Sequence, residues 1–152
     1  QAAAEQAAAE QAAAEQAAAE QAAAEQAAAW ARQQELNQAI ADAAMAQVGV
    51  TDGMWCTEVV EQALAGAGVE DAECLWPDEY ADKYGYYTDH PEVGNLIYYD
   101  NGGRGDDHIA IYIGNGMAVH GHFTPKDGDP QTLVYSAEVE GAGTPQYIQV
   151  LR

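Results

Sequence analysis

The segment His108-Ile-Ala-Ile-Tyr-Ile-Gly-Asn-Gly-Met-Ala-Val-His120 decides the fold of this chain. Two apolar runs flank Asn115-Gly116, the dipeptide that most strongly favours a two-residue hairpin turn. The segment is therefore predicted to form an antiparallel hairpin with a histidine at each end. A lone histidine at a strand end is more often structural than catalytic. Two histidines on one hairpin make a catalytic role a stronger hypothesis.

Further strands are expected around this hairpin, because short apolar runs alternate there with Gly, Pro, Asn and Asp. The expected strands, including those of the hairpin, are Leu96–Tyr99, His108–Ile113, Met117–Phe123, Leu133–Ala137 and Tyr147–Leu151. Helical patterns precede them: one runs to Gln47, a second begins near Cys56, and a short one follows Pro77. Helices first and strands second predict an α+β domain with an antiparallel sheet of about five strands.

Residues 1–29 repeat the pentamer Gln-Ala-Ala-Ala-Glu, and the sixth copy ends at Trp30 in place of Glu. Ala, Gln and Glu all favour helix. Steps of five residues advance about 140° around a helix, so the glutamates spread over every face. No apolar seam for a coiled coil results. The expected organisation is a helical stalk or spacer at residues 1–30 and one domain at residues 31–152.

The 152-residue chain is strongly acidic, with 25 acidic and 5 basic residues and a formal net charge of −20. This charge repels nucleic acids and anionic lipid surfaces, so neither is an expected partner. No stretch has the length and apolarity of a membrane-inserted segment. An amine-bearing substrate is compatible with the charge, although net charge more often reflects solubility. The sequence does not predict an oligomeric state.

Cys56 is the better candidate for a nucleophile. It lies where the second helix should begin, and a helix N-terminus stabilises both a thiolate and an oxyanion. Cys74 is the rival, but the neighbouring carboxylates of Asp71 and Glu73 disfavour a thiolate there. Glu58 would oppose the Cys56 thiolate unless its carboxylate points away. The alternative is that Cys56 is a small buried apolar residue, and a disulfide between the two cysteines would remove the enzymatic interpretation.

The turn decides which histidine lies beside His108. With a plain two-residue turn, His120 would lie on the opposite side of the sheet from His108. The two rings share a face if the loop has three residues or if a bulge restores the parity. His122 would then lie directly opposite His108, and His120 would be the diagonal neighbour of His108. His122 therefore competes with His120 for the contact with His108. His90 is expected at the surface.

These motifs resemble the NlpC superfamily of papain-like cell-wall peptidases, which includes CHAP-type amidases. In that family a cysteine at a helix start precedes a strand beginning His-(Val/Ile)-(Gly/Ala)-Ile-Tyr-(Val/Ile)-Gly, and a hairpin returns to a second histidine that orients the first. Residues 108–114 match the strand, and His120 matches the orienting position. Residues 91–99 resemble the family's Pro-Gly-Asp-Leu-(Val/Ile)-Phe-Phe strand, with Asn95 in place of Asp. The resemblance covers residues 39–151.

The resemblance implies a papain-like fold and a triad of Cys56, His108 and His120 that hydrolyses an amide through a thioester. It implies a substrate among the stem or crosslink peptides of bacterial peptidoglycan, an extracellular or cell-wall location, and no requirement for a metal or organic cofactor. Trp55, Thr57 and Tyr112 are expected to contact the substrate.

The sequence around the nucleophile departs from the family pattern. Family members commonly have Asp-Cys-Ser-Gly, and this chain has Trp55-Cys56-Thr57-Glu58. The Asp and Ser associated with gripping the end of the stem peptide are therefore absent.

Several alternatives stay open at this point. An acyltransferase, a transpeptidase or a toxin could use the same scaffold, and a catalytically silent binding module could be carried on the stalk. A zinc site is a further alternative, with Cys56, His108, His120 and His122 as ligands. The tyrosines that follow Trp76 either line a substrate cleft or pack the short helix against the sheet.

Overall fold

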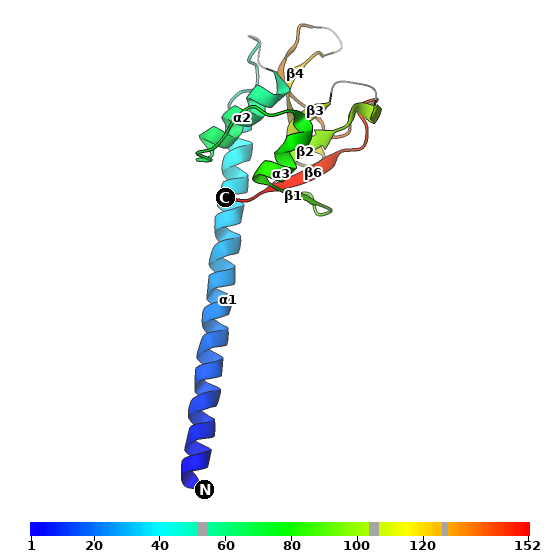
Figure 1. Cartoon of the computed structure of the whole chain (residues 1–152). Helices are drawn as coiled ribbons and strands as arrows, with labels where there is room; N and C mark the ends of the chain where they lie inside the picture. Colours follow the sequence, from blue (N-terminus) through cyan, green and yellow to red (C-terminus); the bar gives the residue numbers. More distant parts are fainter. Residues whose placement is uncertain (52–54, 104–106, 126–127) are drawn as a thin grey trace. The chain divides into compact units, whose positions relative to one another are not determined.

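The computed structural model describes residues 1–51, 55–103, 107–125 and 128–152, and Figure 1 shows its helices and strands. The chain divides into two compact units, Gln1–Gln34 and Glu35–Arg152. Helix α1, Ala2–Met45, contains the whole of the first unit except its first residue, and its last turns belong to the second unit. None of the described helices combines the length and the apolarity needed to cross a membrane.

The first unit is a helix whose polar side chains pair with one another. Within the repeat four Gln amides donate to the Glu carboxylate four residues later, the spacing at which side chains on a helix surface meet. These bonds are Gln6–Glu10, Gln11–Glu15, Gln16–Glu20 and Gln21–Glu25, at 3.2–3.4 Å. Residues 1–30 are all exposed, and the predicted helix is confirmed.

The second unit is an α+β domain, as predicted. Its short helices are α2 (Cys56–Gly66), the 3₁₀ turn η1 (Pro77–Glu79) and α3 (Tyr80–Tyr84). The described strands are β1 (Gly85–Thr88), β2 (Leu96–Tyr99), β3 (His108–Gly114), β4 (Met117–Phe123), β5 (Gln131–Ser136) and β6 (Gln146–Val150). A short 3₁₀ turn, η2 (Asn101–Gly103), follows β2.

The strands form one antiparallel sheet in the order β1-β6-β2-β3-β4-β5. It has six strands where about five were predicted, because β1 also joins the sheet by pairing with β6. Strand β1 was not among the expected strands, because its tyrosines directly follow the aromatic residues of the short helix in one continuous aromatic stretch.

Helices cover one face of the sheet. Helix α2 packs against β3 and β4, and α3 packs against β1 and β6 (Figure 1). The core between them is fully buried and includes Ile40, Val59, Leu64, Tyr80, Ile109, Ile111, Val119 and Ile148. A smaller cluster lies on the opposite face and contains Ile97, Tyr99, Ala110, Ala118 and Ala137.

A buried amide network joins the end of α1 to the sheet. Gln149 donates to Asn37 Oδ1 at 2.8 Å, and Asn95 donates to Gln149 Oε1 at 3.1 Å. Asn95 Oδ1 in turn accepts the backbone N–H of Glu92 at 2.8 Å. Gly94 allows the close approach of α1, because a Cβ there would lie 2.0 Å from the backbone oxygen of Asn37. The amide at position 95 therefore serves as donor and acceptor at once.

Candidate active site

A bulge in the hairpin places His108 and His120 on the same face of the sheet. Asn115 and Gly116 form the turn with φ of 54° and 71°, and Gly114 pairs with Met117. The register then shifts between Tyr112 and Gly114, so that Ala110 pairs with His120. The parity is restored by a bulge, which is one of the two arrangements expected from the sequence.

The two imidazoles form a hydrogen-bonded chain. His108 Nε2 lies 2.9 Å from His120 Nδ1, and His120 Nε2 lies 3.0 Å from the backbone oxygen of Ser136. Because a carbonyl oxygen only accepts, His120 must carry its proton on Nε2. A neutral His120 then accepts at Nδ1 from His108 Nε2–H, which leaves His108 Nδ1 unprotonated. The chain of bonds thus selects the tautomer of His108 in which Nδ1 can take a proton.

Both histidines are held neutral at physiological pH. Burial, and to a smaller extent the charge of His120, lowers the pKa of His108 to about 3. Burial also lowers the pKa of His120 to about 4, against the opposing effect of the Ser136 carbonyl. The ring of Tyr99 lies 5.4 Å from that of His108, and the ring of Phe123 lies 5.0 Å from that of His120, between centroids.

A second bulge, in β4, separates His122 from this pair. His120 pairs with Leu133 and Phe123 pairs with Gln131, so two residues of β4 oppose one residue of β5. His122 adopts a left-handed φ of 50° and is exposed. Its ring lies 4.4 Å from the ring of Trp55. The contact partner of His108 is therefore His120, and His122 lies at the surface, as does His90.

Cys56 is the first residue of α2, and this helix lies directly on β4. A Cβ added at Gly121 would lie 2.5 Å from Val59 Cγ2 and 3.1 Å from Cys56 Cα. Glycine at this position lets the start of α2 reach the sheet. The residue before Cys56, Trp55, makes no side-chain cap, so the cysteine is placed by helix packing rather than by capping.

The Cys56 thiol lies where β3 and β4 separate. The N–H of Tyr112 points toward β2, where it donates to Asn95 O at 2.8 Å. Because backbone N–H groups alternate in direction along a strand, the N–H of Ile109, three residues earlier, points the other way, toward β4. Pairing of β3 with β4 ends at Ala110 and His120, which leaves the Ile109 N–H outside the ladder. This N–H bonds the Cys56 sulfur. The thiol thus lies at the end of β3 that carries His108.

The Cys56 thiol does not rest as a thiolate. Burial raises its pKa, and the backbone amides of Ile109, Thr57 and Cys56 lower the pKa by less. From the sequence, the helix start is expected to lower this pKa. That expectation is wrong, because the effect of burial exceeds that of the amides and the pKa is raised overall. The hydrogen bonds of the described residues include none between Cys56 and His108. The resting pair is a neutral thiol and a neutral imidazole.

Cys74 is a poorer thiolate than Cys56, for a reason that differs from the expected one. Partial burial raises its pKa to about 12, together with the hydrogen bond and charge of Glu61 and the charge of Glu58. The Cys74 sulfur lies 2.8 Å from Glu61 Oε2. Both cysteines are free.

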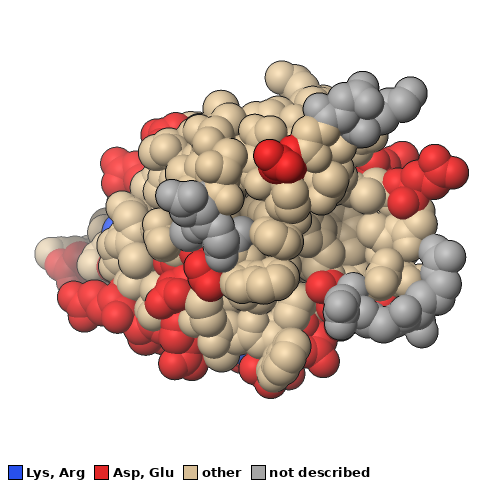
Figure 2. All heavy atoms as spheres, turned by 90° about the horizontal axis from the view of Figure 1, so that it is seen from above, with Lys and Arg blue, Asp and Glu red and all other residues tan. Residues whose placement is uncertain are grey.

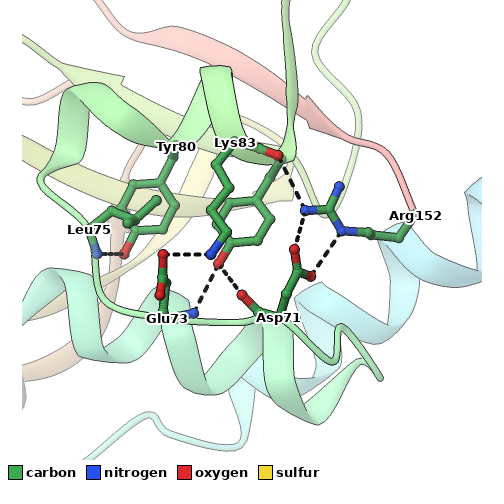
Figure 3. Close-up of polar contacts among 7 residues, drawn as sticks. Asp71, Glu73, Leu75, Tyr80, Lys83 and Arg152 are labelled. Carbon is green, nitrogen blue, oxygen red and sulfur yellow. Dashed lines mark hydrogen bonds and ion pairs between the residues drawn. The ribbon is translucent and has the colours of Figure 1, made fainter.

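The carboxylates that neighbour Cys74 in sequence are engaged elsewhere. Arg152 binds Asp71 at 2.8 Å and Lys83 binds Glu73 at 2.6 Å, and both ion pairs are drawn in Figure 3. The Tyr84 hydroxyl donates to the Asp71 carbonyl at 2.9 Å. The Tyr80 hydroxyl accepts from the Leu75 N–H at 3.2 Å and donates to the Thr57 carbonyl at 3.3 Å. These two tyrosines are buried, so they pack the short helix and hold this loop instead of lining a cleft.

A cleft of about 1090 Å³ opens beside Cys56. Its lining comprises Trp55, Cys56, Thr57, Cys74, Leu75, Trp76, Pro77, Asp78, Glu79 and Asp107. Of the expected substrate contacts, Trp55 and Thr57 lie in it. Tyr112 lies elsewhere: its hydroxyl accepts from the Gly116 N–H at 3.2 Å, and its ring meets Tyr147 edge-on. Sequence reasoning missed Asp78 and Glu79, which the helix start at Pro77 places in the cleft, and Asp107 lines the cleft from the start of the His108 strand.

The zinc alternative has no support in the described part of the chain. Its histidines do not gather, because the bulge in β4 turns His122 away from the His108–His120 pair. Among the described residues, no three His, Cys, Asp or Glu side chains are grouped so as to hold a metal ion.

Solved structures with the same fold include three mycobacterial proteins. The peptidoglycan hydrolase RipB of Mycobacterium tuberculosis has 20% identity and a TM-score of 0.58, and the match covers 80% of this chain and 68% of RipB. The P60 domain of an antigen of M. avium subspecies paratuberculosis has 17% identity and a TM-score of 0.60, covering 80% and 99% of the two chains. RipD of M. tuberculosis, described as a non-catalytic NlpC/p60 domain protein adapted to peptidoglycan binding, has 20% identity and a TM-score of 0.55, covering 76% and 98%.

At these identities the solved structures establish the fold. No curated protein is significantly similar in sequence to this chain. The family model of NlpC/P60 matches residues 7–128, well over half of the sequence. The predicted resemblance is thereby confirmed, and the chain belongs to the NlpC/P60 family.

Proposed function

We propose that the domain hydrolyses amide bonds with Cys56 as nucleophile, His108 as general base and His120 as the residue that orients His108. The observation that carries this proposal is the hydrogen-bonded chain from the Ser136 carbonyl through His120 to His108, at the end of β3 where the Cys56 thiol lies. This chain leaves His108 Nδ1 as the free basic atom, and a general base needs such an atom near the proton that it removes.

The reaction begins from the neutral pair. As the Cys56 sulfur attacks the amide carbon, its proton passes to His108 Nδ1 and the carbonyl oxygen becomes an oxyanion. The backbone N–H groups of Cys56 and Thr57, which already contact the sulfur, are placed to bind the oxyanion. The amine leaves with the proton from His108, and a thioester remains. Water then attacks the thioester, His108 removes the water proton, and the Cys56 thiol leaves with that proton.

The proposed substrates are stem or crosslink peptides of bacterial peptidoglycan, and the proposed location is extracellular or at the cell wall. Family membership supports this choice, as does the fold shared with RipB, a peptidoglycan hydrolase. An acyltransferase or transpeptidase would share every step up to the thioester and would then transfer the acyl group to an amine instead of water. A toxin that attacks another amide would use the same residues on a different substrate.

A peptidoglycan-binding module without activity is the second candidate. Two observations favour it: the fold is shared with RipD, a non-catalytic protein, and the pKa of Cys56 is raised. The distinction between the two candidates therefore depends on turnover.

The test is digestion of purified peptidoglycan, with mass spectrometry of the released peptides. We expect the parent chain to release peptides, Cys56→Ala to lose all measurable turnover because the nucleophile is removed, and His108→Ala to lose about 10²- to 10⁴-fold in rate. His120→Ala should lose less, and His120→Asn less still, because an amide can accept from His108 Nε2–H. Cys74→Ser and His122→Ala are the matched controls and should remain close to the parent.

Retention of peptidoglycan binding by a parent chain that releases no peptide would support the binding module. Loss of turnover in His122→Ala, with parental rates in His120→Ala, would contradict the assignment of the two histidines. Transfer of the acyl group to an added amine in preference to water would identify a transferase.

A further inference from the structure

The buried side chain of Tyr99 lies against both imidazoles of the proposed triad. Tyr99 pairs with His108 across β2 and β3, so the two side chains share a face of the sheet. The phenol ring lies 5.4 Å from the ring of His108 and 6.0 Å from the ring of His120, between centroids. Tyr99 and His120 are both fully buried. The phenol ring therefore packs against the base and against the residue that orients it.

The hydroxyl of Tyr99 contacts the backbone segment that holds His120 from its other side. It donates to the backbone oxygen of Ala137, the first residue after β5. The N–H of Ala137 donates to Gly116 O at 2.8 Å, in the turn between β3 and β4. This N–H and the Ser136 carbonyl belong to one planar peptide group, so they point in opposite directions. The bond to Gly116 therefore aims the Ser136 oxygen at His120 Nε2, 3.0 Å away, and the Tyr99 hydroxyl anchors the next carbonyl.

The partner of His120 is a neutral carbonyl, although the protein is rich in carboxylates. Figure 2 shows Asp and Glu spread over the visible face, with only traces of Lys and Arg. A carboxylate beside an imidazole would form a charge-assisted bond, which is about twice as strong as a bond between neutral groups. The carbonyl of Ser136 lacks this charge, so its direction depends on how firmly its own backbone is held.

The direction of this carbonyl decides which nitrogen of His108 is free. While Ser136 O faces His120 Nε2, that nitrogen keeps its proton, and His120 Nδ1 accepts from His108 Nε2–H. With the carbonyl turned away, a fraction of the molecules places the His120 proton on Nδ1, which then donates to His108 Nε2. His108 carries its own proton on Nδ1 in that fraction and cannot take the proton of Cys56.

We propose that Tyr99 is a positioning residue that keeps His108 in its basic tautomer. Its hydroxyl acts by anchoring the backbone that presents the Ser136 carbonyl to His120, and its ring limits the movement of the two imidazoles. This inference rests on the proposed function, because the tautomer affects turnover only if His108 is the base. A tyrosine that merely fills the core would contribute stability alone.

The test compares Tyr99→Phe with a matched variant, Tyr84→Phe, in the full chain. Tyr84 is also fully buried, and its hydroxyl also donates to a backbone carbonyl, that of Asp71. Its side chain belongs to the core on the helix-covered face of the sheet, away from the histidine pair. Each variant loses one buried hydroxyl, so the guanidinium midpoint should fall by a similar amount in both.

Turnover should separate the two variants. With soluble peptidoglycan fragments, kcat should fall about tenfold in Tyr99→Phe, because part of the enzyme holds the wrong tautomer. KM should stay parental, since Tyr99 is not among the described residues that line the cleft. Tyr84→Phe should keep the parental kcat. In a chain that carries His120→Ala there is no second ring to orient, so adding Tyr99→Phe should lower kcat no further.

A second measurement reads the tautomers directly and needs no turnover. Nitrogen NMR of the imidazole rings distinguishes a protonated ring nitrogen from an unprotonated one. In the parent chain and in Tyr84→Phe we expect the proton on Nε2 of both His108 and His120. In Tyr99→Phe we expect a measurable share of His108 with the proton on Nδ1.

Unchanged tautomers in Tyr99→Phe would overturn the inference, and so would a parental kcat in that variant. An equal loss of kcat in Tyr84→Phe would also overturn it, because the effect would then follow from stability alone. A further loss of kcat on adding Tyr99→Phe to His120→Ala would show that the hydroxyl does not act through His120. A tautomer shift in Tyr99→Phe, with no peptide released by the parent chain, would leave the positioning role in place and refute the hydrolase proposal.

Discussion

The contact between α2 and Gly121 allows a sharp test of how Cys56 is positioned. In Gly121→Ala the new Cβ would lie 2.5 Å from Val59 Cγ2, 3.0 Å from Val59 Cβ and 3.1 Å from Cys56 Cα. Carbon atoms that are not bonded prefer a separation of about 3.5 Å or more, so the start of α2 must move by about 1 Å. Overpacking of this kind costs about 1–3 kcal/mol of stability.

The loss of activity should exceed what this loss of stability explains. A misplacement of about 1 Å at a reacting atom costs up to about 10²-fold in rate. We therefore expect kcat/KM for peptide release to fall about 10- to 100-fold in Gly121→Ala, in protein that is still folded at the assay temperature. Guanidinium unfolding and the turnover assay are measured on the same preparation.

Val59→Ala supplies the control, because it removes the atom nearest to the new methyl group. Alone, it should cost stability by leaving a cavity. Combined with Gly121→Ala, it should recover part of the activity, and the two changes should not be additive. Parental turnover in Gly121→Ala, or a double variant that simply adds the two losses, would refute the view that the contact with Gly121 positions Cys56.

Two further predictions concern buried polar groups. In Asn95→Asp the donor to Gln149 Oε1 is lost and two acceptors face each other, so the free energy of unfolding should fall by about 1–3 kcal/mol; an unchanged midpoint in guanidinium would contradict the donor role. Stability should also fall as the pH drops from about 6.5 toward 4, because unfolded histidines take up protons near pH 6.5 while His108 and His120 stay neutral until about pH 3 and 4. His120→Asn should weaken this dependence, and a flat profile between pH 7 and 5 in the parent would refute the buried neutral pair.

The sequence predicts those features of the fold that depend on neighbouring residues. The hairpin follows from alternating apolar residues around Asn115-Gly116, and the start of α2 follows from the pattern around Cys56. Both are local signals, which is why strand β4 has the predicted bounds and α2 begins at the predicted residue. The sequence also shows that a three-residue loop or a bulge is needed for the two histidines to meet. Successive side chains of a strand alternate between the two faces of the sheet, so the number of residues between the histidines decides which face each one is on.

What the sequence could not predict depends on distant parts of the chain. Strand β1 exists because it pairs with β6, which follows it by more than fifty residues of sequence. The bulge at His122 is fixed by the pairing of β4 with β5, and no turn residue at position 122 announces it. The carboxylates that act on Cys74 come from α2 and not from its sequence neighbours, since Asp71 and Glu73 are bound by Arg152 and Lys83.

The pKa values connect these structural features to the choice between a hydrolase and a binding module. At a helix start, local amides favour a thiolate, but burial outweighs them at Cys56 and also removes the charge from His108. Burial thus disfavours both the thiolate of Cys56 and the imidazolium of His108 in the resting protein. The nucleophile must then form during the attack itself, when the substrate fills the cleft and the oxyanion takes up the backbone N–H groups. Slow reaction of Cys56 with small alkylating reagents is consequently expected of both candidates. Only turnover of a substrate that occupies the cleft separates them.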